Sequence, residues 1–205
     1  MRVIFKEKPD YLKSLDEMES LVQNIINGDE EEVWFLEYDD LYTVGSGDIV
    51  KSNYINNIPV FKTNRGGKIT YHGCGQRIVY FMIDLKKFFY PNQPDISKFV
   101  EILEDIVISS LKEIGISSNK LDVNHGVWCG TNKISAIGIR LKKWVTYHGL
   151  SLNVNTNLDF YNYINPCGIS FDEYGVTSIS RESGIKHYLM SSIDSVLIRK
   201  IKEIF

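Results

Sequence analysis

The chain has 205 residues, of which 43% are hydrophobic and 24% charged, and this composition excludes an intrinsically disordered protein. The length suits one domain with a substantial core, so we expect residues 1–205 to form a single domain. The net charge of −3 argues against nucleic acid as the main partner, and three cysteines without CxxC spacing argue against a disulfide framework or a four-cysteine zinc site.

Targeting signals are weak along the chain. The N-terminal segment lacks the apolar core of a signal peptide, and the longest apolar stretch, Ile78 to Ile83, is too short to span a bilayer. An odd number of cysteines fits reduced thiols. We therefore expect a cytoplasmic protein that binds neither membrane nor nucleic acid.

The charge is spread unevenly. Residues 1–64 hold 6 Lys/Arg and 13 Asp/Glu, whereas residues 65–205 hold 17 and 13. This pattern indicates either scattered solvated charge or a basic surface, around Arg140, Lys142 and Lys143, that meets an acidic partner.

The first predicted element is a helix over residues 10–27, where apolar side chains recur at three- and four-residue steps and Gly28 follows as a stop. The acidic run at residues 29–32 predicts an exposed turn, and Val33–Leu36 predicts a buried strand. Two more strands are predicted over residues 58–61 and 77–85.

The second half begins with the clearest helix, residues 96–114, which follows Pro91 and Pro94 and ends at Gly115. The predicted elements after it are strands over residues 123–129, 134–141 and 152–155 and an amphipathic helix over residues 193–205. Helices and strands mix without strict βαβ alternation. The predicted fold class is α+β (mixed α/β), with a largely antiparallel mixed sheet flanked by helices.

Residues 65–76, RGGKITYHGCGQ, place four glycines in twelve positions. The spacing matches neither the P-loop nor the dinucleotide fingerprint. Such a segment forms either ordinary turns or, because it lacks Cβ atoms, one wall of a narrow slot for an extended ligand.

Residues 126–138, GVWCGTNKISAIG, contain Lys133 at the start of a predicted strand. A lysine there is usually solvated, but inside a pocket its charge would stabilise an anion. Ala136 and Gly138 are small enough to admit a ligand against this strand.

The segment Pro166-Cys167-Gly168 suits a sharp turn that presents one side chain. A cysteine is most often a buried small hydrophobe, but a thiol near a cation becomes a reactive thiolate. The candidate helpers are Lys133, His72 and His148, the last in a backbone-rich stretch with Gly149 and Ser151. Each histidine is either a structural residue or an acid–base group.

Taken together, these segments resemble the lipoyl(octanoyl) transferases, the octanoyl-[acyl-carrier-protein]:protein octanoyltransferases. The resemblance runs from about Trp34 to Ile179 and rests on RGGKITYHGCGQ, KISAIGIR, WVTYHGLSLNVN, INPCGI and GVTSI. The sequence departs from the usual pattern in two places: Cys74 stands where the family has proline, and Tyr38-Asp39-Asp40 stands where its upstream motif has His-Pro-Pro.

The resemblance implies roles for particular residues. Cys167 matches the acylated cysteine and Lys133 the lysine that lowers its pKa. The implied substrate-binding stretches are Arg65, Gly66, Gly67, Lys68, Ile69, Thr70, Tyr71 and His72; Ala136, Ile137 and Gly138; and Gly149, Leu150 and Ser151.

The resemblance also implies the reaction, which is octanoyl transfer from octanoyl-acyl carrier protein to a lysine of an apo lipoyl domain, through an acyl-cysteine thioester. Acceptors would be 2-oxoacid dehydrogenases or the glycine cleavage H protein, and neither a metal nor another cofactor is expected. Two alternatives stay open: an ATP-dependent lipoate or biotin ligase, and a non-catalytic acyl-binding protein of the same fold.

Overall fold

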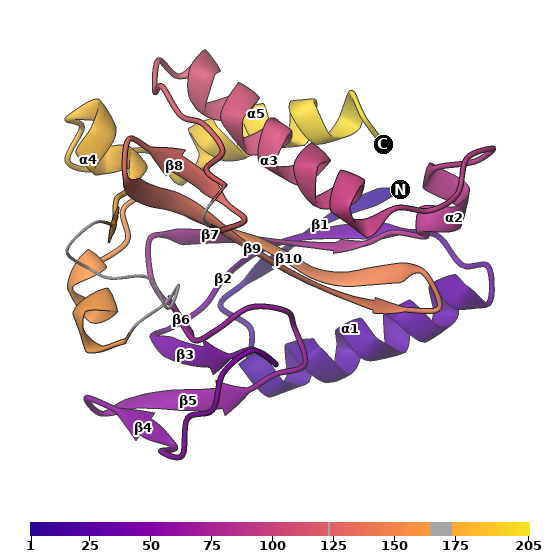
Figure 1. The fold of residues 1–205 in the computed structure, drawn as a ribbon, viewed down its shortest axis with the longest axis horizontal. Helices are drawn as coiled ribbons and strands as arrows, with labels where there is room; N and C mark the ends of the chain where they lie inside the picture. The colour runs from indigo at the N-terminus through magenta and orange to yellow at the C-terminus, as the bar shows by residue number, and fades with distance from the viewer. Residues whose placement is uncertain (123, 165–173) are drawn as a thin grey trace.

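The computed structural model describes residues 1–122, 124–164 and 174–205, and within them a seven-stranded sheet separates two helical layers (Figure 1). The strand order is β1-β2-β7-β10-β9-β11, and β8 pairs with the outer edge of β9. These strands are β1 (Arg2–Glu7), β2 (Glu32–Glu37), β7 (Gln76–Met82), β8 (Val127–Cys129), β9 (Asn132–Lys142), β10 (Val145–Asn153) and β11 (Gly175–Val176).

Most neighbouring strands of this sheet run antiparallel. The parallel pairs are β1 with β2 and β9 with β11. The predicted α+β class with a largely antiparallel mixed sheet is thereby confirmed.

Helices cover both faces of the sheet. Helices α3 (Ile96–Glu113) and α5 (Met190–Lys202) lie on one face, and α1 (Tyr11–Ile26) lies on the other (Figure 1). The shorter helical elements are α2 (Leu85–Phe88), η1 (Leu158–Tyr163) and α4 (Ile179–Ser183).

Alternate residues of the central strands enter different cores. In β2, Val33 and Phe35 pack in the cluster beneath α3 and α5, whereas Trp34 and Leu36 pack in the cluster beneath α1. Because both faces are covered, the strand appears in the sequence as a continuous apolar run.

A second sheet lies beside the α1 face and holds the order β4-β5-β3-β6 (Figure 1). Its strands are β3 (Leu41–Val44), β4 (Tyr54–Ile55), β5 (Ile58–Lys62) and β6 (Thr70–His72). Tyr71 of β6 packs into a third core cluster together with Ile69. Side chains alternate along a strand, so Thr70 and His72 point the other way, toward the main sheet.

Several predicted boundaries differ from the structure. Glu32 is buried in β2 rather than exposed in a turn. It pairs with Arg2 and accepts a hydrogen bond from Trp34 Nε1 at 2.6 Å. The strand predicted over residues 77–85 ends at Met82 because Asp84 caps α2 by accepting from the Lys86 N–H. The strand predicted over residues 152–155 begins much earlier, at Val145.

The strand predicted over residues 123–129 is a strand only at Val127–Cys129, because residues 124–126 form a turn whose His125 O binds Lys133. The remaining predicted elements are confirmed within a few residues. Val123, the first residue of one predicted strand, lies outside the described residues. Among the helices of the described ranges, none is both long and apolar enough to cross a membrane.

Candidate active site

The floor of a cavity of about 330 Å³ is built from two rungs of the main sheet. Each rung is a row of residues that pair across neighbouring strands. In one rung Ala136, Ser151 and Ile78 stand side by side on β9, β10 and β7. The next rung on the same face places Gly138 beside Gly149 and Tyr80. Four of these six residues have small side chains, so the sheet face is left uncovered just where the cavity lies.

The glycine-rich segment forms the roof. Gly67 and Lys68 border the cavity, and Thr70 and His72 project into it from β6. The Gly66 N–H donates to Ile139 O at 3.2 Å and so attaches this loop to β9. A Cβ at Gly138 would lie 3.1 Å from Gly66 O, so glycine at Gly138 permits the loop to approach.

Arg65 holds the roof to the second sheet. Its Nη2 donates to Thr43 O and to Thr43 Oγ1, both at 2.7 Å, and its Nη1 donates to Gly66 O at 2.9 Å. Burial lowers the pKa of Arg65 below its ordinary value. Because arginine stays protonated in proteins, the guanidinium still supplies positive charge at one end of the cavity.

His72 is fixed in one neutral form by its neighbours. Thr43 Oγ1 already accepts from Arg65, so its own proton points to His72 Nε2 at 3.1 Å. His72 Nδ1–H then donates to Gln76 Oε1 at 2.7 Å. Burial and the nearby Arg65 charge lower the pKa of His72 to about 4. With both ring nitrogens engaged, His72 has a structural role.

His148 is likewise uncharged. Asn64 Nδ2 donates to Glu19 and to Tyr147, which leaves Asn64 Oδ1 to accept from His148 Nε2 at 3.1 Å. Burial, with Arg65 nearby, lowers the pKa of His148 to about 3. His148 also adopts φ 61°, a left-handed backbone that is uncommon outside glycine.

The two buried histidines should make the fold sensitive to acid. Their pKa values lie below the ordinary 6.5, so the unfolded chain binds more protons as the pH falls below 6.5. Between pH 7 and pH 5 the free energy of unfolding should fall by about 2 kcal/mol for each histidine. Chemical denaturation at the two pH values measures this change.

Matched variants separate the two histidines from other titrating groups. His148→Gln should halve the pH-dependent loss, whereas the same change at the exposed His187 should leave it intact. An equal loss in wild type and His148→Gln would contradict the assignment.

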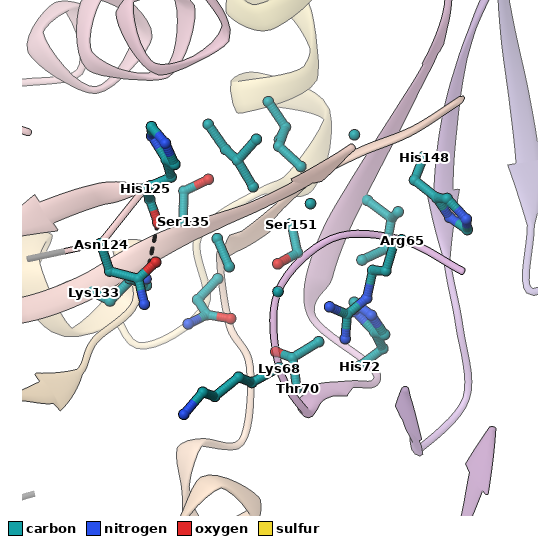
Figure 2. A pocket seen from close by; sticks show the side chains of 18 of the residues that line it. Arg65, Lys68, Thr70, His72, Asn124, His125, Lys133, Ser135, His148 and Ser151 are labelled. Atoms are coloured by element: carbon teal, nitrogen blue, oxygen red, sulfur yellow. Dashed lines mark hydrogen bonds between the residues drawn. The ribbon is translucent and has the colours of Figure 1, made fainter. Parts of the chain in front are cut away.

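Lys133 lies at the opposite end of the cavity from Arg65. Figure 2 shows it with Asn124 and His125, while Arg65, His72 and His148 gather at the other end. Lys133 is only 7% exposed, and its Nζ donates to His125 O at 3.0 Å. The ammonium also lies 4.6 Å from the centre of the Trp128 ring, which attracts a cation. Lys133 is therefore not a solvated surface lysine but lies inside the pocket.

The structure brings most of the predicted binding residues to one cavity. Those that border it are Arg65, Gly67, Lys68, Thr70, His72, Lys133, Ala136, Ile137, Gly138, Gly149, Leu150 and Ser151. Three others do not border it: Gly66, which is bonded to β9, and Ile69 and Tyr71, which pack in the third core cluster. The side chains of Ile137 and Leu150 pack with the cluster beneath α3 and α5.

Sequence reasoning did not find several residues that line the cavity. They are Tyr11, Gly47, Ile78, Tyr80, Asn124, His125, Ile134, Ser135, Asn153, Tyr161 and Val176. Ile78 and Tyr80 belong to an apolar run, and only the register of β7 with β10 shows that they face the site. Tyr11 comes from α1, and the apolar spacing of that helix gave no indication that it borders a site.

The three cysteines differ. Cys167 lies outside the described residues. Cys129 is buried in a core cluster, as expected, and burial raises its pKa to about 11. Cys74 is exposed, with its Sγ 3.1 Å from Lys8 Nζ, and does not border the cavity. Over the described ranges, no three His, Cys, Asp or Glu side chains are grouped to hold a metal ion.

Solved structures show which known fold this chain has. The fold superimposes on a bi-partite lipoate protein ligase from Thermoplasma acidophilum with a TM-score of 0.77, at 18% identity over 99% of this chain and 82% of the other. It also matches the biotin protein ligase of Aquifex aeolicus with a TM-score of 0.56, at 14% identity over 99% and 68%. A mixed sheet with this cavity is thus the catalytic-domain fold of the lipoate- and biotin-protein ligases.

Sequence comparison narrows this class. The family model for the lipoyl protein ligase A/B catalytic domain matches residues 10–202. The octanoyltransferase of Ehrlichia chaffeensis is 44% identical over 202 residues, covering 96% of this chain and 91% of that protein. The octanoyltransferase of Wolbachia pipientis subsp. Culex pipiens is 41% identical over 212 residues, covering 99% and 98%. The chain belongs to the octanoyltransferases of the lipoyl protein ligase A/B family, and is therefore an acyltransferase. The predicted family is confirmed.

Proposed function

We propose that this enzyme moves an octanoyl group from octanoyl-acyl carrier protein to a lysine of an apo lipoyl domain, through a thioester on Cys167, as a single cytoplasmic domain of residues 1–205. The observation that carries the proposal is the cavity itself. A buried ammonium, Lys133, stands at one end of a slot whose floor has small residues at four of its six positions. An extended acyl chain fits such a slot, and a reacting thioester fits the end at Lys133.

The proposed reaction has two halves. In the first, the Cys167 thiolate attacks the thioester carbonyl, a new C–S bond forms, and the carrier leaves as a thiol after taking up a proton. In the second, the lysine amine of the lipoyl domain attacks the acyl-cysteine, an amide bond forms, and the Cys167 thiolate is released with loss of a proton from the amine. A thiol suits both halves because it exchanges with a thioester readily and leaves readily.

The residues that flank Cys167 support its place in this scheme. Val176 of β11 pairs with Lys133 of β9 and borders the cavity. On the other side, Tyr161 borders the cavity and Ile164 is buried beside it in the third cluster, three residues before Cys167. Two residues that border the cavity, Tyr161 and Val176, therefore lie on either side of Cys167 in the sequence.

Lys133 would stabilise the Cys167 thiolate by its charge and exchange protons with it. The tetrahedral oxyanion needs N–H donors, for which the backbone amides near Gly73, Ala136 and Cys167 are candidates. Gly73 does not border the cavity. Ala136 borders the cavity, but it pairs with Ser151 in the β9–β10 ladder, so its N–H is already used. The proposal therefore retains the Cys167 N–H.

The alternatives differ in their need for ATP and in turnover. With octanoyl-acyl carrier protein and an apo lipoyl domain, in the absence of ATP, we expect the octanoylated domain to accumulate over many turnovers, as followed by intact mass spectrometry. A strict requirement for ATP and free octanoate would indicate a ligase. A stoichiometric complex without product would indicate an acyl-binding protein.

The same assay tests how the acidic carrier approaches. Arg140, Lys142 and Lys143 are exposed at the β9–β10 hairpin, but Lys142 is nine residues along β9 from Lys133, or about 30 Å. Lys68 is exposed and borders the cavity (Figure 2). If the hairpin docks the carrier, neutralising its three cations lowers the second-order rate at low salt and Lys68→Gln does not. The reverse result assigns docking to the cavity mouth.

A further inference from the structure

A buried carboxylate stands behind the Lys133 end of the cavity. Glu104 lies on the inner face of α3 and is only 3% exposed. Its Oε1 accepts a hydrogen bond from the Gly126 N–H at 2.9 Å and lies 3.4 Å from His125 Nδ1. Its Oε2 lies 3.9 Å from Lys120 Nζ. Burying a carboxylate is costly, so its bonds to this turn must be strong enough to offset desolvation.

The turn that Glu104 holds is the one that holds Lys133. His125 O accepts from Lys133 Nζ at 3.0 Å, and Gly126 is the next residue. Gly126 has φ 131°, and a Cβ there would lie 2.5 Å from Ser135 O and 3.2 Å from Lys133 Cε. The turn therefore has little room to shift without moving the lysine side chain.

We propose that Glu104 is a positioning residue for Lys133, acting through the His125–Gly126 turn. The inference rests on the proposed function, because it takes the work of Lys133 to be the stabilisation of the Cys167 thiolate. Glu104 does not itself border the cavity. Its carboxylate fixes the carbonyl that holds the ammonium in place, and a small displacement of such a group has a large effect on rate.

The variants follow from the chemistry of the contact. Glu104→Gln keeps an oxygen that can accept from Gly126, whereas Glu104→Met has similar length and no acceptor. Asp105→Asn, an exposed position on the same helix that pairs with Lys120, is the matched control for lost charge. The readout is the pH profile of iodoacetamide alkylation of Cys167, followed by peptide mass spectrometry.

Glu104→Met should move the alkylation midpoint upward and lower turnover by about ten- to a hundredfold. Glu104→Gln and Asp105→Asn should stay near wild type. The double variant Glu104→Met/Lys133→Met should show no more shift than Lys133→Met alone, because the two residues act as one unit.

Three outcomes overturn the inference: a wild-type midpoint in folded Glu104→Met, a midpoint in Glu104→Gln as high as in Glu104→Met, or additive shifts in the double variant. If Lys133→Met itself leaves the midpoint unchanged, the proposed role of Lys133 fails instead. Should Glu104→Met not fold, Glu104→Leu removes the same acceptor with a shorter side chain. The inference then requires the same upward shift, and a wild-type midpoint there refutes it.

Discussion

Replacing Cys167 with serine should lower octanoyl transfer by about a thousandfold or more, because the covalent intermediate can no longer form at a useful rate. Wild-type enzyme incubated with octanoyl-acyl carrier protein should gain the mass of one octanoyl group, in a bond that hydroxylamine cleaves. The Cys167→Ser variant should gain none. Intact and peptide mass spectrometry measure both results.

The other two cysteines provide the controls. Cys129 is buried and its pKa is raised, and Cys74 is exposed outside the cavity, so Cys129→Ser and Cys74→Ser should both keep the adduct. An octanoyl group that persists in Cys167→Ser, or is mapped to Cys74, would refute the proposed nucleophile while leaving the family assignment intact.

Replacing Lys133 with methionine should have the second largest effect, a loss of about a hundredfold at neutral pH. Removing a buried cation raises the pKa of a neighbouring thiol, so less thiolate exists at pH 7. The loss should deepen as the pH falls and shrink as it rises above the new thiol pKa. Turnover measured from pH 6 to pH 9.5 shows the displaced profile.

Lys68→Met is the matched control, since Lys68 also borders the cavity but is exposed. It should keep the wild-type pH profile even where docking of the carrier is weakened. A Lys133→Met profile that is lowered in parallel, with no displacement along the pH axis, would mean that Lys133 acts on the substrate rather than on the thiol.

The longer helices and the buried strands could be predicted from the sequence because their apolar periodicity is strong. The early part of β10 could not. Thr146, His148, Gly149 and Ser151 interrupt the apolar pattern. The last three border the cavity instead of filling a core, and Thr146 donates a hydrogen bond to Phe81 O at 2.7 Å. Short strands such as β6 depend on pairing partners distant in sequence, Leu41–Thr43 in that case.

The site was predictable as segments and unpredictable as a set of contacts. Motif resemblance identified the small residues at Ala136, Gly138, Gly149 and Ser151. Only the register of three strands shows that these residues lie together in two adjacent rungs on one face of the sheet. Glu104 gave no signal at all, because a glutamate on a helix is ordinarily solvated and only the packing of α3 against the Gly126 turn shows otherwise.

Lys133 lies on the same strand, β9, as Ala136 and Gly138, the residues that β9 contributes to the two rungs. From Lys133 to Gly138 is five residues of extended backbone, or about 16 Å, a length fixed by covalent geometry rather than by the packing of helices. In the proposed reaction, this strand sets the distance between the reacting thioester near Lys133 and the far end of the acyl chain near Gly138. Substrate length could therefore change during evolution through substitutions near Gly138, while the chemistry proposed at Lys133 stayed the same.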